Sequence, residues 1–217
     1  MKIELKNKVE KLIENYKKVM NAFLEELKGW EADSLYSSDY RQDKIREVKA
    51  QMLNNDADFN KQLLNIITEE KEAILNSTIK KPADYQVLIS NAIGFINLLG
   101  NKLTDEEAFE LVKPFFGDYQ TMKRFYAVLS EINGLNVTTY SLGLFDKAIN
   151  NLEILKNNFA KFFDAGTYTT NGLAYALKET ALLSDIEDIE RIIQKLDSII
   201  PASYKEVEAE LKNEMVV

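Results

Sequence analysis

The chain contains neither cysteine nor histidine among its 217 residues. Without cysteine it has no disulfides and no thiolate nucleophile. Without histidine it lacks the commonest metal ligand and the usual general base near neutral pH, which excludes serine–histidine and cysteine–histidine nucleophiles. A structural zinc site is not expected, because such sites are built mainly from these two residue types. Any catalysis would fall to carboxylates, lysines, tyrosines or hydroxyls.

Long apolar runs are also missing. No stretch approaches the roughly 18 apolar residues that a membrane-spanning helix needs, and the N-terminus has scattered charges where a secretion signal has an apolar block. The first predicted helix is amphipathic but balanced in charge, so we expect no binding to membrane surfaces. The glycines are too far apart to form a phosphate-cradling loop.

Proline and glycine are scarce and unevenly placed. All three prolines and seven of the eight glycines lie at or after Pro82. Charge changes at the same place: residues 1–81 carry 15 basic and 15 acidic side chains, whereas residues 82–217 carry 12 and 20. We therefore predict a boundary at Thr78–Pro82, with one domain at 1–80 and a second, acidic domain at 82–217.

Residues 3–80 have apolar side chains at intervals of three and four, the period of an amphipathic helix. A polar turn at Ser34–Ser38 divides them, so we expect two long helices folded back as a coiled-coil-like hairpin. In the second helix, from about Asp39 to Asn76, the apolar stripe is interrupted at Asn54–Asp58. This polar run is compatible with a continuous helix or with a short turn capped by Asp56, and both alternatives stay open.

Beyond residue 80 the helices are shorter and their starts are marked. Three segments have the spacing of a capping box, in which a serine or threonine caps the helix and a glutamate three residues later bonds back. They are Thr104–Glu107, Ser184–Glu187 and Ser203–Glu206. No segment alternates like a strand over a useful length. The sequence therefore predicts an all-α protein, with the N-terminal hairpin followed by a bundle of five to six helices.

Two carboxylate clusters, in residues 105–110 and 185–190, are the candidates for catalysis. Glu107 and Glu110 share one helix face, as do Glu187 and Glu190. Two such faces opposed in a bundle would suit Mg²⁺ and phosphate chemistry, an arrangement similar to that of all-α nucleotide pyrophosphohydrolases. However, both clusters fall in the first turns of predicted helices, where carboxylates cap the helix and oppose its dipole. We favour capping, and expect no metal, no cofactor and no enzyme activity.

Aromatic side chains gather in residues 115–126 and 159–175. Stacking on single-stranded nucleic acid would also require a basic groove. The region from Pro82 onward carries the whole net charge of −8, which would repel phosphate. We therefore assign these aromatic residues to the core and expect no nucleic-acid partner.

The end of the predicted hairpin carries large apolar residues that two helices bury only in part. They are Leu24, Leu27, Trp30, Leu35 and Tyr36. Such a surface is covered either by the chain's own helices or by a partner protein, and the sequence leaves both open. We take these five as candidate protein-interaction residues and expect a homo-oligomer.

The segment Tyr36–Ala50 resembles the early part of small helical proteins from phage and prophage structural-gene clusters. In those proteins a first helix is followed by a polar turn and a long charged helix. The run Asn91–Leu129, with its Leu-Leu-Gly and Gly-Asp-Tyr elements, is similar to their second half. The resemblance implies a structural role in a phage head, neck or scaffold. Residues 203–217 depart from scaffolding proteins, which often end in a basic helix, because they are acidic.

These observations lead to the hypothesis of a non-enzymatic, phage-type structural or assembly protein. It would act through helix-mediated self-association and protein contacts, in the host cytoplasm or in the virion. The first alternative is a cytosolic helical adaptor or regulator that binds one protein partner. The second is the Mg²⁺-dependent phosphohydrolase described above.

Overall fold

The computed structural model describes residues 4–160 and 163–214. Of the aromatic residues assigned to the core, Phe162 lies outside this part. Within it the regular structure is helical and contains no strand, which confirms the predicted all-α class. The elements are α1 (Leu5–Ala32), α2 (Ser38–Leu75), α3 (Tyr85–Leu99), η1 (Gly100–Lys102), α4 (Asp105–Val112), η2 (Lys113–Phe115), α5 (Tyr119–Leu129), α6 (Asn136–Asn158), α7 (Ala165–Thr170), α8 (Gly172–Ile199) and α9 (Tyr204–Glu214).

The chain divides into two compact units. The hairpin unit comprises Lys2–Glu70 with Leu152–Asp188, and the multi-helix unit comprises Lys71–Asn151 with Ile189–Val217. Helices α2, α6 and α8 contribute residues to both. This division differs from the predicted boundary near residue 80, because residues 152–188 group with the N-terminal helices. Local charge and proline content do not report which distant segments pack together.

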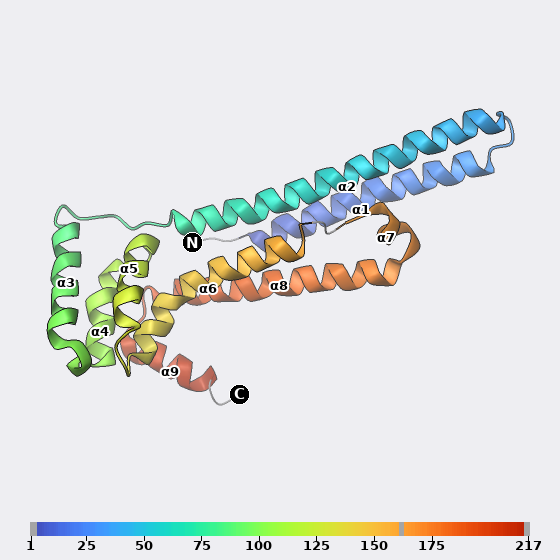
Figure 1. The fold of residues 1–217 in the computed structure, drawn as a ribbon. Coiled ribbons are helices and arrows are strands. Elements are labelled where there is room, and N and C mark those ends of the chain that lie inside the picture. The colour runs from blue at the N-terminus through green and yellow to red at the C-terminus, as the bar shows by residue number, and fades with distance from the viewer. Residues whose placement is uncertain (1–3, 161–162, 215–217) are drawn as a thin grey trace. The chain divides into compact units, whose positions relative to one another are not determined.

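In the hairpin unit, α1 and α2 run side by side in opposite directions (Figure 1). Lys8 Nζ lies 2.7 Å from Glu70 Oε1 across the pair. Helix α2 continues unbroken through Asn54–Asp58, so no turn forms there. The reason is that Asp56 itself occupies the buried stripe of α2, one turn after Met52. The remaining large buried residues of this stripe are Val48, Phe59, Leu63, Ile67 and Ile74.

Residues 152–188 pack onto this helix pair. Lys6 Nζ lies 2.6 Å from Glu187 and Lys17 Nζ lies 2.7 Å from Glu179, which ties α1 to α8. Close to these pairs the ring of Phe163 stacks on Tyr16, with centroids 4.3 Å apart. Much of the hairpin is therefore covered by the chain itself.

The multi-helix unit holds the shorter helices, and α3 contacts both α4 and α5. The predicted box at the start of α4 is present, since Thr104 Oγ1 accepts the Glu107 N–H and the Glu107 carboxylate accepts the Thr104 N–H. The box predicted at Ser184 is wrong, because Ser184 lies inside the continuous helix α8. Residues 165–170 form the short helix α7. The described residues after 82 thus form seven α-helices, more than the five to six expected.

Candidate protein-interaction site

The hairpin tip comprises the end of α1, the connection at residues 33–37 and the start of α2. Leu35 is 90% exposed and Tyr36 is 51% exposed. Trp30, in the last turn of α1, is half-buried. Three of the five predicted residues therefore lie together at an apolar surface.

The other two predicted residues lie deeper. Leu27 is buried and Leu24 is half-buried, and both line an apolar groove of about 350 Å³. The other lining residues are Lys49, Met52, Leu53, Ala165, Gly166 and Thr169. Leu27 was expected to be exposed unless something covered it, and the structure shows that its own chain covers it.

Three aromatic rings meet at the tip. The Trp30 ring centroid lies 6.0 Å from that of Tyr36 and 6.1 Å from that of Tyr40, and the two tyrosine centroids are 5.2 Å apart. Such separations are typical of favourable aromatic pairs. Tyr40 is exposed and was missed by the sequence analysis, although it stands four residues after Tyr36, the spacing of neighbours on a helix face. We call Trp30, Leu35, Tyr36 and Tyr40 the tip cluster.

Short-range hydrogen bonds hold the connection in place. The Leu35 N–H donates to Asp33 Oδ1 at 2.7 Å, and the Tyr40 N–H donates to Ser37 Oγ at 3.3 Å at the start of α2. Lys44 Nζ also lies 5.8 Å from the centroid of the Tyr40 ring, within range of a cation–π contact. The exposed side chains are therefore presented from a bonded backbone, which lowers the ordering entropy that a partner has to overcome.

Charges of both signs surround the tip cluster. Lys44 Nζ lies 2.6 Å from Glu47, and Arg46 lies 3.1 Å from Asp43, all four in the first three turns of α2. A surface of mixed sign allows the basic groups of one copy to face the acidic groups of another. The tip therefore has no charge barrier to self-association.

The first carboxylate cluster caps helices. The Asp105 carboxylate accepts the Val137 N–H at 2.7 Å and the Thr138 N–H at 3.0 Å, at the start of α6. The Thr138 hydroxyl donates to the same carboxylate at 2.7 Å. Together with Glu107 in its capping box, this arrangement supports the capping interpretation for residues 105–107.

The second cluster lies inside α8 and not at a helix start, so the capping interpretation is wrong there, and Glu187 is paired with Lys6. Across residues 4–160 and 163–214, no group of three or more acidic side chains is placed to hold a metal ion.

Replacing Asp105 tests its capping role. We expect Asp105→Ala to lower the free energy of unfolding by about 1–2 kcal/mol, because two N–H groups of α6 lose their acceptor. The neighbouring Glu106 is exposed, so Glu106→Ala should change it by less than about 0.5 kcal/mol. Urea unfolding followed by far-UV circular dichroism measures both. Equal effects would contradict the assignment.

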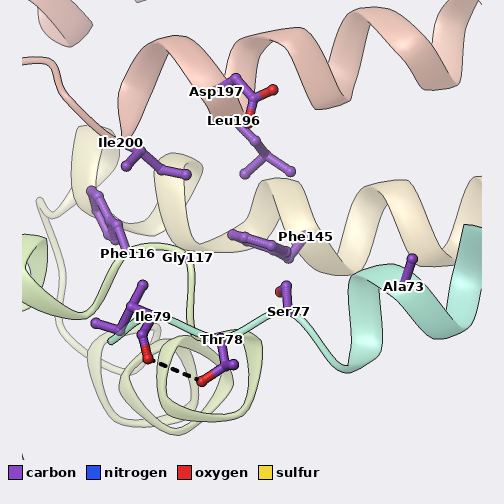
Figure 2. A pocket seen from close by; sticks show the side chains of 10 residues that line it. All are labelled: Ala73, Ser77, Thr78, Ile79, Phe116, Gly117, Phe145, Leu196, Asp197 and Ile200. Carbon is purple, nitrogen blue, oxygen red and sulfur yellow. Dashed lines mark hydrogen bonds between the residues drawn. The ribbon is translucent and has the colours of Figure 1, made fainter. Parts of the chain in front are cut away.

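A separate cavity of about 370 Å³ lies in the multi-helix unit (Figure 2). Its apolar wall includes Phe116, Phe145 and Ile200. Gly117 has φ +97° there, and a Cβ on it would stand 2.9 Å from Ile79 Cγ2, so glycine fits both the backbone and the space. The remaining lining residues are Ala73, Ser77, Thr78, Leu196 and Asp197. With a single charged side chain, this lining does not specify a ligand chemistry.

Among the described residues no helix has both the length and the apolar character to cross a membrane. Comparisons with protein-family models, curated proteins and solved structures found no match to the chain. The fold and the surface thus define the class: an all-α chain of two compact units that presents an exposed aromatic cluster.

Proposed function

We propose that the chain is a non-enzymatic structural or assembly protein that works through helix-mediated contacts, first of all with copies of itself. The observation that carries the proposal is the tip cluster. Its residues Leu35, Tyr36 and Tyr40 stay exposed and hydrogen bonds hold the connection in place, whereas Leu27, one turn before the tip, is buried.

The composition of the tip cluster supports a protein partner. Tryptophan and tyrosine are the residues on which binding energy at protein interfaces concentrates, and they offer large contact areas with few rotatable bonds. Grouped exposed apolar side chains are uncommon on surfaces that bind nothing. A two-fold contact between tips would bury the same cluster on both copies.

The similarity of residues 36–50 and 91–129 to phage structural proteins supports virion assembly as the setting of this role. In that setting the chain would act in the host cytoplasm or in the virion, and coat or portal proteins would be additional partners. Terminase, portal or tail genes next to its gene would support this setting. A neighbourhood without phage genes would favour an adaptor role.

The test introduces charge at the tip. In Leu35→Glu/Tyr36→Glu, a two-fold contact would bring four like charges together, so we expect the dissociation constant to rise at least about tenfold. Size-exclusion chromatography with light scattering across a wide range of concentration measures it. Leu173→Glu/Leu177→Glu is the matched control, because these leucines of α8 are 74% and 63% exposed.

The control should retain the mass distribution of the wild-type chain. A wild-type chain that is monomeric at every concentration, with no partner recovered, would argue against self-association. So would equal dissociation of the tip and control variants. Circular dichroism on each variant confirms that the helices are intact.

A further inference from the structure

Helix α3 in the multi-helix unit is apolar on more sides than its own packing uses. Its inner side is buried through Tyr85, Ile89, Ala92 and Ile96. No charged residue occurs from Tyr85 to Asn101. A surface helix of a soluble domain normally has a charged outer side, so the uncharged outer side of α3 needs an explanation.

Large apolar side chains cover that outer side. Leu98 is 80% exposed and Phe95 is 56% exposed, and Val87 and Leu88 are also exposed. At 100° per residue these four fall on one face, together with the exposed Asn91 and Gly94. We call these six residues the α3 outer face. A contiguous apolar face of this kind marks an interaction surface.

Gly94 points to a helix as the occupant. Glycine inside a helix is less stable than alanine, and Gly94 has ordinary helical backbone geometry. A Cβ added to it would meet nothing within 4 Å, so the chain's own packing does not require glycine. A missing side chain on an exposed helix face allows the backbone of another helix to approach closely.

We infer that the α3 outer face binds the same face of a second copy, with the two α3 helices antiparallel. The central stripe Val87, Asn91, Gly94 and Leu98 has spacings of four, three and four, which read the same in both directions. In an antiparallel pair Val87 of each copy therefore meets Leu98 of the other. Asn91 meets Gly94, where the absent side chain leaves room for the amide.

Charge favours a second copy over another partner. The multi-helix unit, residues 71–151 with 189–217, carries 12 basic and 15 acidic side chains, so two copies of it have the same sign of net charge. The α3 outer face has no charged residue, so two units can meet there without bringing like charges together. It also offers no charge with which to select a basic or acidic partner. The self-complementary spacing and the neutrality of the face both favour a second copy as the partner.

This inference extends the proposed self-association to a surface that the tip cluster does not include. Two two-fold contacts on one chain, one at the tip and one at α3, link copies into assemblies larger than a dimer. An assembly protein needs at least two such contacts to grow. A single contact would stop at a dimer.

The experiment uses the full chain and light scattering. Phe95→Glu/Leu98→Glu should raise the dissociation constant of the α3 contact at least tenfold and leave dimers held by the tip. Gln86→Glu is the matched control, because Gln86 is an exposed residue on another side of the same helix. It should behave like the wild-type chain. Combining the α3 and tip variants should give monomers.

Gly94→Ala supplies a milder probe. It should raise the thermal midpoint of the isolated chain, because alanine favours the helix, yet weaken association several-fold, because the added methyl separates the two helices. A higher midpoint with unchanged association would overturn the inference.

The remaining outcomes separate the two surfaces. If Phe95→Glu/Leu98→Glu leaves the mass unchanged while the tip variant yields monomers, the α3 inference is wrong and the proposed function stands. If the α3 variant yields monomers and the tip variant changes nothing, the α3 contact is supported and the tip contact is wrong. The wild-type chain could instead bind phosphatidylcholine vesicles, and Phe95→Glu/Leu98→Glu could abolish this binding without changing the mass of the protein in solution. That result would show that the face binds lipid, and would also overturn the inference.

Discussion

Asp118→Ala is expected to lower the free energy of unfolding of the multi-helix unit by about 2–4 kcal/mol. The carboxylate is buried and binds three donors: Lys81 Nζ at 2.7 Å, the Tyr85 hydroxyl at 2.9 Å and the Thr121 N–H at 3.4 Å. Alanine removes the cap of α5 and leaves the buried Tyr85 hydroxyl without its charged acceptor. It also leaves Lys81 without the ion pair that joins the segment before α3 to α5.

Two further variants sharpen this expectation. Asp118→Asn keeps a capping oxygen but removes the charge, so it should cost less than alanine. Asp84→Ala is the control, because Asp84 occupies the N-cap position of α3 without making a side-chain capping bond. Its effect should stay below about 0.5 kcal/mol. Urea unfolding, with hydrogen exchange of α5 peptides to localise the effect, measures all three.

The pH dependence of this effect follows from the partners of Asp118. Burial alone would raise the pKa of Asp118, but the Lys81 ammonium and the hydrogen bonds from Tyr85 and Thr121 hold it below the ordinary value of 3.8. A carboxyl with a lowered pKa in the folded state contributes stability above its ordinary pKa and loses it as the pH falls through the lowered value. The difference in free energy of unfolding between the wild-type chain and Asp118→Asn should therefore be greatest above pH 3.8 and shrink in stronger acid. An advantage that grows with acid would contradict the assignment.

The helices of this chain could be predicted from sequence because their signals are local. The three-and-four periodicity located α1 and most of α2, and the Thr104 capping box located α4. The errors arose where distant residues decide. Asp56 looked like a break in α2, yet its partners Tyr16 and Ala165 are 40 and 109 residues away in the sequence. A pattern read over a short window cannot contain them.

The candidate site was predictable to the same extent. Leu35 and Tyr36 were identified because a hairpin end leaves its apolar residues without neighbours. Leu27 was assigned to the same surface, but α7 and α2 help to form a groove over it, and that contact joins segments about 140 residues apart. The α3 outer face was hidden for the opposite reason. An apolar helix reads as a core helix, and its exposure becomes visible once the packing of α4 and α5 on one side is known.

Asp56→Ala is expected to lower the free energy of unfolding of the hairpin unit by about 2–4 kcal/mol. The carboxylate is buried on α2. It accepts the Tyr16 hydroxyl at 2.7 Å and the Ala165 N–H at the start of α7 at 2.6 Å. Alanine leaves the buried Tyr16 hydroxyl and the half-buried Ala165 N–H without this acceptor. Asp58 is exposed two residues away, and Asp58→Ala should change the stability by less than about 0.5 kcal/mol.

Acidification should change the stability contribution of Asp56 in the opposite direction to that of Asp118. Burial, together with the nearby charge of Asp164, raises the pKa of Asp56 above 3.8 although its two hydrogen bonds oppose the shift. The folded state therefore holds the proton more tightly than the unfolded chain, and this contribution to stability is present below pH 3.8 and lost as the pH rises through the raised value. Relative to Asp56→Asn, the wild-type chain should gain stability on acidification. A pH series of urea unfolding measures the slope, and a slope of the same sign as that of Asp118 would contradict it.

A double-mutant cycle isolates the bond that joins α1 to α2. Tyr16→Phe alone removes one donor to Asp56 and should cost about 1–2 kcal/mol. In the Asp56→Ala background the same change should cost far less, because the hydroxyl no longer has its acceptor and its removal relieves an unsatisfied buried group. The coupling between the two positions should therefore be about 1 kcal/mol or more. Additive effects would show that the buried carboxylate stabilises the hairpin unit through Ala165 and α7, and not through the pairing of its two long helices.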